Sequence, residues 1–437
     1  MSNHPLRLGI AGLGTVGIAL INVLNKNAEM MRDRCGREIV VTAVNARDKS
    51  RDRGVDLSVY EWFDNAEDMA SSDDIDVFVE LIGGEEGVAL DASRKALENG
   101  KHVVTANKAM LAKHGVALAK EAEAQGVLLN FEAAVAGGIP IIKTIRETLT
   151  ANNVERVYGI MNGTCNYMLT RMEREGISYE DCLADAQALG YAEADPTFDV
   201  EGFDTAHKLA ILTSLAFGTE TASDEIYVEG ISSITTEDIQ AAKSLGYRIK
   251  LLGVAAKTET GIEQRVHPTM VPLDSSIAQI SGVTNAVAID ADIVGNLVMS
   301  GPGAGGDATA SAVAGDIADI AKCVPGEQKV PALGKPANEL APYKKAQMQS
   351  HEGGYFIRMT VKDHAGVFAA IATTMAKYDI SLESIVQHGE QEDTSNTDKT
   401  IILITHATTE SAVREALEAI GKDKYLSRQP QMIRIEK

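Results

Sequence analysis

The sequence has few cysteines, and its apolar residues never form a long run. The four cysteines lack the paired or metal-binding spacing of a disulfide framework or a zinc site. No apolar stretch approaches the roughly 20 residues that cross a bilayer, and the first residues lack the basic-then-apolar order of a secretory signal. We therefore expect free thiols in a cytoplasmic protein that spans no membrane.

Basic residues are also in short supply. Lys and Arg together number 41, against 62 Asp and Glu, which gives a formal net charge of −21. A chain this acidic is a poor partner for nucleic acid or for an anionic membrane surface. An anionic cofactor is not excluded, because local donors can outweigh a distant net charge. With 437 residues, 45% of them hydrophobic, the chain has room for about three domains.

Residues 1–140 predict an α/β domain with a parallel, Rossmann-type sheet. Strands that alternate with helices form a parallel sheet covered on both faces. Five short segments, separated by stretches with helical spacing, are the expected strands: residues 6–11, 39–44, 77–82, 103–105 and 128–132. Residues 141–323 mix helices with a β-rich stretch and predict an α+β catalytic domain.

Prolines gather in residues 324–351, where four of the chain's 11 occur. Proline suits neither a helix interior nor a central strand, so this segment is expected to be a linker. Residues 352–437 then follow the order strand, helix, strand, strand, helix, strand. That βαββαβ order predicts a third, ferredoxin-like domain.

A glycine-rich motif directly follows the first predicted strand and opens a helix. Its residues are Gly12, Leu13, Gly14, Thr15, Val16 and Gly17, in the G-x-G-x-x-G spacing of dinucleotide-binding loops. The glycines permit a tight turn and let the backbone approach a pyrophosphate at the positive end of the helix dipole. The motif predicts a nicotinamide cofactor.

The end of the second predicted strand bears on the choice between NAD and NADP. No carboxylate stands at the strand tip to bind a ribose 2′-hydroxyl, whereas Arg47, Lys49 and Arg51 lie close enough in sequence to meet a 2′-phosphate. This pattern favours NADP, with NAD as the alternative cofactor. The alternative for the loop itself is a solvated segment of mixed charge.

Asp204 and Lys208 lie four residues apart on a predicted helix and therefore share one face. An ordinary helical ion pair is the alternative interpretation. Two features argue against it: the helix continues with apolar residues, and the preceding loop supplies Glu193, Asp195 and Asp199. We interpret this concentration of charge as a candidate active site.

Five further motifs, in order along residues 105–305, complete a family resemblance. They are Thr105-Ala106-Asn107-Lys108, Phe131-Glu132 through Gly137-Gly138-Ile139-Pro140, Asn162-Gly163-Thr164-Cys165-Asn166-Tyr167, Gly190-Tyr191-Ala192-Glu193-Ala194-Asp195-Pro196, and Gly301-Pro302-Gly303-Ala304-Gly305. With the glycine loop, they resemble the homoserine dehydrogenase family. Residues 352–437 separately resemble an ACT domain.

The resemblance implies reversible NAD(P)-dependent oxidation of L-homoserine to L-aspartate-4-semialdehyde. This reaction serves threonine, methionine and isoleucine biosynthesis, and a homo-oligomer is expected. By resemblance, Glu193, Asp199 and Asp204 bind the substrate, and Lys208 exchanges a proton with its oxygen. Lysine with an ordinary pKa of ~10.4 is a poor base, so burial or a second cation, with Lys108 as the candidate, should lower the pKa of Lys208.

The family also implies further cofactor and cation contacts. Thr105, Lys108, Gly190, Gly303 and Gly305 are expected to border the cofactor. A monovalent cation, with Na⁺ as the candidate, would bind the backbone oxygens at four positions: Glu132, Val135, Gly137 and Ile139. The alternative for this segment is a turn without an ion.

The C-terminal domain predicts a feedback site for an amino acid, with L-threonine as the effector. Its loop, with Asp363, His364 and Gly366, opens a helix N-terminus suited to a carboxylate. The alternative is a structural dimerisation domain.

A rival enzyme class would use Cys165, in an expected loop after a strand, as the nucleophile of an acylating semialdehyde dehydrogenase. No histidine stands near Cys165 in sequence to act as its base.

Overall fold

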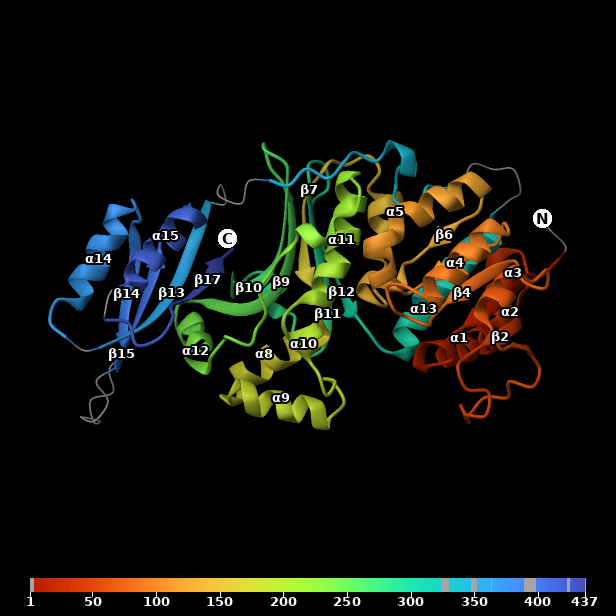
Figure 1. Cartoon of the computed structure of the whole chain (residues 1–437), viewed down its shortest axis with the longest axis horizontal. Helices are drawn as coiled ribbons and strands as arrows, with labels where there is room; N and C mark the ends of the chain where they lie inside the picture. The colour runs from red at the N-terminus through yellow and green to blue at the C-terminus, as the bar shows by residue number, and fades with distance from the viewer. Residues whose placement is uncertain are drawn as a thin grey trace.

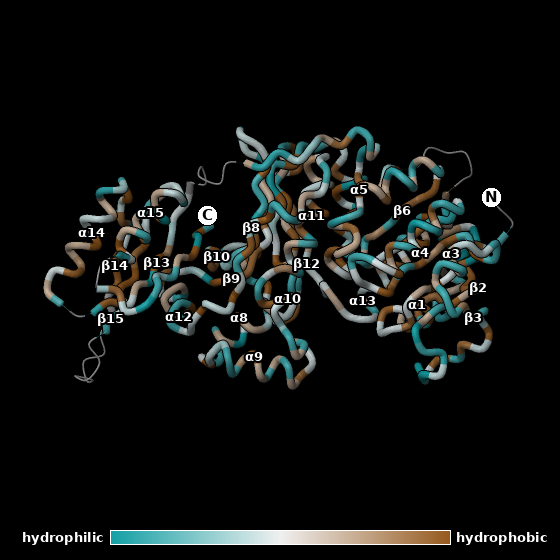
Figure 2. Tube along the Cα trace, viewed as in Figure 1, coloured by the Kyte–Doolittle hydropathy of each residue, from teal (hydrophilic) through white to brown (hydrophobic). Residues whose placement is uncertain are grey.

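A computed structural model describes residues 4–323, 330–346, 352–362, 364–388, 398–422 and 425–436. The molecule is elongated, with the N-terminal sheet at one end and the C-terminal unit at the other (Figure 1). Hydrophobic residues concentrate along the strands of both sheets and the helix faces that cover them (Figure 2). The predicted effector residue Asp363 and parts of the predicted linker lie outside the described residues.

The first sheet has six parallel strands in the order β3-β2-β1-β4-β5-β6. The predicted Rossmann-type parallel sheet is therefore confirmed. Sequence reasoning missed β3, whose three residues are too few to show a pattern. The strands are β1 Leu6–Ala11, β2 Ile39–Asn45, β3 Glu61–Phe63, β4 Val77–Glu80, β5 His102–Thr105 and β6 Leu129–Asn130. The helices are α1 Thr15–Lys26, α2 Ala28–Cys35, α3 Ala66–Ser71, α4 Val88–Glu98 and α5 Lys108–Gln125.

Helix α13, Gly306–Lys322, completes this half of the molecule from far along the chain. It packs against α1. Its residues Val313 and Ile317 are fully buried in the same hydrophobic cluster as Leu8 and Ile10 of β1. Helix α13 thus helps to cover the first sheet, although it follows the central strands of the second sheet in the sequence.

The second sheet forms the centre of the molecule and extends to its C-terminal end, in the order β12-β11-β7-β9-β10-β17-β13-β15-β14. Its central strands are β7 Val154–Ile160, β8 Tyr227–Val228, β9 Tyr247–Lys257, β10 Ile262–Pro272, β11 Thr284–Ala291 and β12 Gly295–Pro302. The main covering helices are α8 Gly163–Glu175, α9 Tyr179–Ala188, α11 Phe203–Phe217 and α12 Thr236–Ser244. The short helices α6 Ala133–Ala136, α7 Ile141–Lys143 and α10 Thr197–Val200 connect these parts.

The C-terminal unit has the predicted βαββαβ order. Its elements are β13 Glu352–Lys362, α14 Val367–Lys377, β14 Leu382–His388, β15 Asp398–Thr405, α15 Glu410–Gly421 and β17 Gln431–Ile435, with the two-residue β16 Thr408–Thr409 before α15. The strands lie in the order β17-β13-β15-β14, and all the neighbours in this order are antiparallel. The ferredoxin-like prediction is confirmed.

The structure adds that this unit does not stand apart from the rest of the chain. Strand β17 pairs in parallel with β10, with Thr269 opposite Arg434, so both units share one sheet. The described part of the proline-rich segment also follows the central domain, where the Ala341 amide donates to the Gly218 carbonyl at 3.1 Å.

One local expectation was wrong. The segment from Asn162 to Asn166, expected to be a loop, is the start of α8. The Asn162 side chain caps this helix by accepting a hydrogen bond from the Cys165 amide at 2.9 Å. An asparagine before a helical stretch is a recognised start signal, and here it outweighs the glycine and threonine that favour a loop.

Candidate active site

Asp204 lies between two lysines that come from the two halves of the molecule. One carboxylate oxygen, Oδ1, is 2.8 Å from Lys108 Nζ, and the other, Oδ2, is 2.7 Å from Lys208 Nζ. Lys208 also donates to the Met161 carbonyl at 2.6 Å. Asp204 and Lys208 lie one turn apart on buried α11, whereas Lys108 opens α5 beside the first sheet. The structure therefore brings these three predicted residues into one cluster.

The position of Lys108 is unusual for a lysine. A positive charge in the first turn of a helix opposes the helix dipole. Asn107 supplies the cap, since its side chain accepts from the Met110 amide. The helix dipole does not stabilise the positive charge of Lys108, but the negative charge of the Asp204 carboxylate does. The placement of Lys108 is thus explained by the cluster and not by the helix it begins.

The cluster separates the proton affinities of its members. Burial alone would raise the pKa of Asp204, but the ammonium groups of Lys208 and Lys108 hold it well below its usual range. Burial lowers the pKa of Lys208, and the charge of Lys108 lowers it further against the opposing effect of Asp204. Burial also acts on Lys108, yet Asp204 leaves its pKa raised. Lys208 is therefore the lysine that loses a proton more readily.

A second layer of polar contacts holds Asp204 in place. Asn162 donates from Nδ2 to Asp204 Oδ2 at 2.9 Å and to Asp199 Oδ1 at 2.8 Å. Burial and the nearby charge of Asp204 raise the pKa of Asp199. Sequence reasoning missed this role of Asn162, although the residue begins one of the family motifs. His207, next to Lys208 in sequence, is half-buried, and its ring makes a T-shaped contact with Phe198 at 5.5 Å between ring centres.

Glu193 lies differently from the other predicted substrate residues. Its side chain is exposed, and its carbonyl accepts from Gln187 Nε2 at 3.0 Å. Among the described residues, no hydrogen bond or ion pair joins the Glu193 carboxylate to the Asp204 cluster. Its role as a substrate ligand stays a prediction.

The glycine loop has the geometry that a dinucleotide requires. A Cβ on Gly12 would come within 2.3 Å of the Leu81 carbonyl oxygen, and one on Gly17 within 2.1 Å of the Gly12 carbonyl oxygen. A Cβ on Gly14 would meet nothing within 4 Å. Two of the glycines therefore allow close internal packing, while the middle one leaves an open face.

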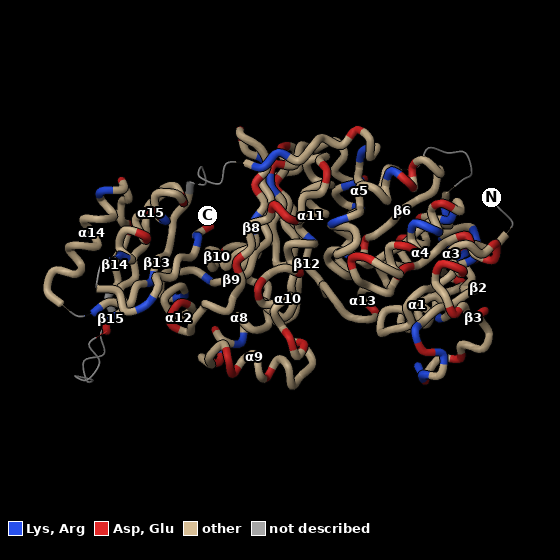
Figure 3. Tube along the Cα trace, viewed as in Figure 1, with Lys and Arg blue, Asp and Glu red and all other residues tan. Residues whose placement is uncertain are grey.

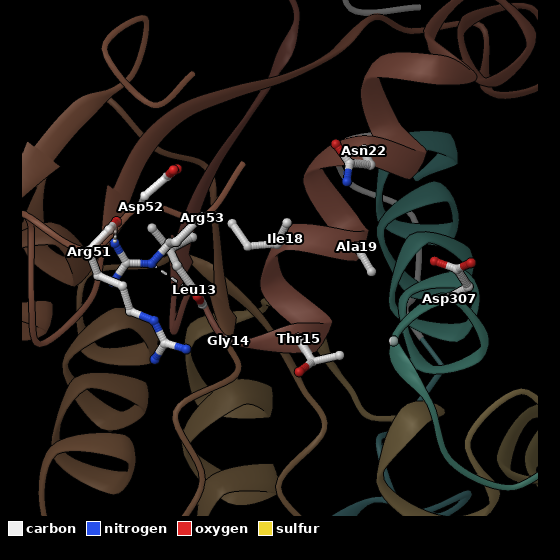
Figure 4. Close-up of a pocket in the computed structure, with 11 residues that line it drawn as sticks. Leu13, Gly14, Thr15, Ile18, Ala19, Asn22, Arg51, Asp52, Arg53 and Asp307 are labelled. Atoms are coloured by element: carbon white, nitrogen blue, oxygen red, sulfur yellow. Dashed lines mark hydrogen bonds between the residues drawn. The ribbon is translucent and has the colours of Figure 1, made fainter. Parts of the chain in front are cut away.

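That open face borders a cavity of about 550 Å³ between the N-termini of two helices. Gly14 and Thr15 line it from α1, and Gly306 and Asp307 line it from α13 (Figure 4). Two helix N-termini present positive dipole ends and free amides to one space, which suits a pyrophosphate. The site fits the cofactor that the motif predicts.

The cavity wall opposite α13 carries two arginines, Arg51 and Arg53 (Figure 4). Arg53 Nε donates to the Leu13 carbonyl at 3.2 Å, and its guanidinium lies 6.0 Å from the Trp62 ring centre. Arg47 is exposed and stands outside the residues that line this cavity. Sequence reasoning missed Arg53, although it lies in the same basic run.

The remaining predicted cofactor residues are of two kinds: Thr105 and Gly303 make contacts within the protein, whereas Gly190 and Gly305 border open space. Thr105 is fully buried, and its hydroxyl donates to Glu80 and accepts from the Asn107 amide. Gly303 allows close packing, because a Cβ there would overlap the Asn285 side chain. Gly190 and Gly305 both have positive φ and open space where a Cβ would stand.

The candidate cation segment forms the short helix α6 and the turn that follows it. The Glu132 side chain accepts the amides of Ile142 and Lys143, and Gly137 has φ +55° where its backbone meets Gly303. Val135 and Ile139 are buried. The described residues contain no group of three or more His, Cys, Asp or Glu side chains that could hold a metal ion. A site made of backbone oxygens is not of that kind and stays a prediction.

The other two predicted effector residues precede α14. Gly366 has φ +94° and stands immediately before the first residue of the helix. His364 is exposed, and its amide donates to the Lys362 carbonyl at 2.9 Å. Their binding role stays a prediction.

The rival nucleophile has the wrong surroundings for that chemistry. Cys165 is fully buried, and its thiol donates to the Asp199 carbonyl. Burial and the charges of Asp199 and Asp204 raise its pKa well above the ordinary value. A nucleophilic cysteine needs the opposite shift.

A parallel sheet whose first strand ends in a glycine loop, next to a buried aspartate held by two lysines, defines an NAD(P)-dependent oxidoreductase. Residues 12–132 match the NAD-binding domain family of homoserine dehydrogenase, residues 140–318 match the homoserine dehydrogenase family, and residues 355–423 match the ACT domain family. The chain belongs to the homoserine dehydrogenase family.

Similar proteins cover the whole chain. The homoserine dehydrogenase of Pseudomonas aeruginosa is 45% identical over 436 residues, 99% of each chain, and that of Neisseria gonorrhoeae is 44% identical over 434 residues, also 99% of each. The crystal structure of a homoserine dehydrogenase from Thiobacillus denitrificans superposes with a TM-score of 0.93 at 42% identity and covers 100% of this chain and 99% of that one. A hyperthermophilic archaeal homoserine dehydrogenase in complex with NADPH covers 72% of this chain and 97% of its own, with 26% identity and a TM-score of 0.62. Among the described helices, none combines the length and hydropathy needed to cross a membrane.

Proposed function

We propose that Lys208 is the proton-exchanging residue of this homoserine dehydrogenase, with Asp204 and Lys108 setting its proton affinity. The observation that carries this is the position of Asp204, which bridges the two lysines at 2.7 and 2.8 Å. When bound, the nicotinamide supplies or accepts the hydride. During oxidation, Lys208 Nζ takes the proton of the substrate γ-hydroxyl, and during reduction it returns a proton to the aldehyde oxygen.

The remaining charges suit a substrate with an α-ammonium and an α-carboxylate. Asp204 and Asp199 offer carboxylate oxygens to the ammonium, and Glu193 lies in the exposed loop that precedes them. Lys108 keeps its proton, as its raised pKa indicates, so it can carry positive charge toward the substrate and cofactor. Asn162 holds both aspartates at a constant separation.

The test is Lys208→Ala, which should lower kcat for homoserine by about 10²–10⁴-fold because a general acid/base is lost. Cofactor binding, followed by fluorescence titration, should hardly change, since Lys208 lies outside the cavity beside the glycine loop. Lys113→Ala is the matched control, because this lysine on the same α5 as Lys108 pairs instead with Glu85 at 2.9 Å. A Lys208→Ala enzyme with wild-type kcat would exclude the proposed role.

For the cofactor, we propose a preference for NADP, with the 2′-phosphate met by the basic run from Arg47 to Arg53. Two arginines of that run line the cavity, and the archaeal relative was solved with NADPH. The turn from Glu132 to Ile139 is proposed to hold Na⁺ through backbone oxygens. We also propose that the protein is cytoplasmic and forms a homo-oligomer.

The ACT domain is proposed to bind L-threonine and inhibit the enzyme. An amino-acid carboxylate suits the N-terminus of α14, and the sheet shared with the catalytic domain offers a route for coupling. Calorimetry of the full-length protein with millimolar L-threonine should show binding, and the same concentration should reduce the rate. Heat of dilution alone would exclude threonine as the effector.

A further inference from the structure

A basic cavity of about 420 Å³ lies outside the active site, where α8, α12 and β9 meet. Asp and Glu are spread over every part of the chain (Figure 3). Against this background, the cavity is lined by four cations and one carboxylate: Arg174, Lys243, Arg248 and Lys250, with Glu173. Such an excess of positive charge in so acidic a chain calls for a compensating anion.

The carboxylate of Glu173, which lines the cavity, already forms an ion pair with Arg248. Arg248 donates one hydrogen bond from an Nη atom to Glu173 at 2.8 Å and another from its second Nη atom to the Ala278 carbonyl, and its Nε lies 2.7 Å from the other Glu173 oxygen as an ion pair. Glu173 therefore compensates Arg248. The other three cations have no ion-pair partner among the described residues.

Buried Lys250 is a second feature of the cavity that indicates an anionic ligand. Its side chain is 1% exposed, yet its Nζ donates only to neutral oxygens: Asn166 Oδ1 at 2.9 Å and the Ile280 carbonyl at 2.5 Å. A buried ammonium whose direct contacts are all neutral is costly. Burial and the charge of Arg248 lower its pKa to about 8 against the opposing charge of Glu173. One of its three N–H donors is left for a ligand in the cavity.

The mouth of the cavity supplies further donors on flexible side chains. Arg174 and Lys243 are exposed, and Arg174 uses one nitrogen on the Ser281 hydroxyl at 3.3 Å. A carboxylate would compensate only one of the three cations, whereas a phosphate group carries up to two charges and a tetrahedral set of acceptors. We propose that this cavity binds a phosphate group, as the free ion or as a small phosphate monoester.

The site is separate from the catalytic cluster but shares α8 with it. Asn162 caps α8 and holds Asp204, while Arg174 lies twelve residues further along, a rise of ~18 Å. Asn166, which accepts from Lys250, lies one turn beyond Asn162. A ligand in the cavity would therefore contact the helix that positions the catalytic aspartate.

The experiment is calorimetric titration of the full-length protein with inorganic phosphate and, separately, with glycerol 3-phosphate. Saturating oxidised cofactor is present to occupy the helix N-termini of the cofactor cavity. At least one ligand should bind, and Arg174→Gln combined with Lys243→Gln should weaken its binding about tenfold or more. Tighter binding of the ester would identify a phosphorylated metabolite as the occupant; equal or weaker binding would identify free phosphate.

The matched control is Arg32→Gln with Lys95→Gln, which removes two exposed cations from the other half of the molecule and should leave binding unchanged. Lys250→Met should abolish the ligand-induced rise in Tm, because it removes the buried donor that faces the cavity. If Lys250→Met does not fold, the Arg174→Gln/Lys243→Gln variant, which changes only exposed side chains, still tests whether the cavity binds phosphate.

Three results would overturn the proposal. One is the absence of binding by either ligand up to about 10 mM, and another is equal affinity in the Arg174/Lys243 variant and its control. The third is a change of oligomeric state in that variant, seen by sedimentation velocity, without anion binding by the wild type. That result would assign the cations to acidic residues of a second copy.

Discussion

Asp204 is the residue through which the two halves of the active site act on each other. Its two oxygens hold Lys108 of the cofactor half and Lys208 of the catalytic half; Asp204 and Lys208 are buried, and the Lys108 side chain is 34% exposed. Charges at 2.7–2.8 Å in such surroundings change each other's proton affinity strongly. Lys108 and Asp204 therefore affect the pKa of Lys208 in opposite directions.

This opposition predicts a pair of shifts in the pH dependence of homoserine oxidation. With Lys208 as the proposed base, oxidation needs its neutral form, so kcat should rise with pH through the pKa of that lysine. Lys108→Met removes a charge that lowers this pKa, so the rising limb should move to higher pH. Asp204→Asn removes the group that raises it, so the limb should move to lower pH.

The measurement is kcat for homoserine against pH in both variants. Lys113→Met, on the same helix but paired with Glu85, is the control and should leave the limb in place. Shifts of both variants in the same direction would contradict the assignment of Lys208 as the base.

At the scale of elements, the cofactor cavity is built from two helix N-termini and one loop. Gly306 of α13 would bring a Cβ within 3.1 Å of the Thr15 side chain of α1, so these helix ends lie against each other. The third wall is the loop after β2, where Arg53 is held by the Leu13 carbonyl and Arg51 is exposed. The loop thus has one anchored and one free arginine at the cavity.

This arrangement predicts which position selects the cofactor. Arg51→Gln should lower the NADP-to-NAD ratio of kcat/KM by about tenfold, because only NADP carries a 2′-phosphate for a bidentate arginine. Arg47→Gln, outside the cavity lining, should change the ratio less. Steady-state kinetics with both cofactors measures it. An unchanged ratio in both variants would mean that this loop does not select the cofactor.

At the scale of the whole molecule, the ACT domain and the catalytic domain share a buried ion pair as well as a sheet. Arg358 of β13 donates to both oxygens of Asp238 on α12, at 2.6 and 3.1 Å, and both side chains are buried. Arg434 of β17, the strand that joins the two domains, is held by Glu410 of α15. Movement of the ACT domain would have to break or carry along these contacts.

The Arg358–Asp238 pair predicts a strong asymmetry between single and double substitutions. Arg358→Met leaves a buried carboxylate uncompensated and should cost about 3–5 kcal/mol of unfolding free energy. Adding Asp238→Leu should restore much of that loss, because no buried charge then remains. Denaturant unfolding of both variants measures the difference. Equal loss in the single and double variants would mean that the uncompensated charge of Asp238 is not the cause of the loss.

Local sequence determined most of the elements and the common face of Asp204 and Lys208. The period-2 and period-3.6 patterns placed most strands and helices, because burial of one face is a local property of spacing. The four-residue spacing alone placed Asp204 and Lys208 on one face of a helix. The glycine spacing located the cofactor loop for the same reason, since backbone clearance depends on adjacent residues.

Tertiary structure alone decided which distant elements meet. No local pattern indicates that Lys108, 96 residues before Asp204, reaches its second oxygen at 2.8 Å, or that α13 packs on α1. The pairing of β10 with β17 also cannot be predicted from local sequence, because an edge strand offers the same backbone donors and acceptors to any partner. Contacts of this kind depend on how packed elements dock, and the free energy of docking is a sum over surfaces that are far apart in the chain.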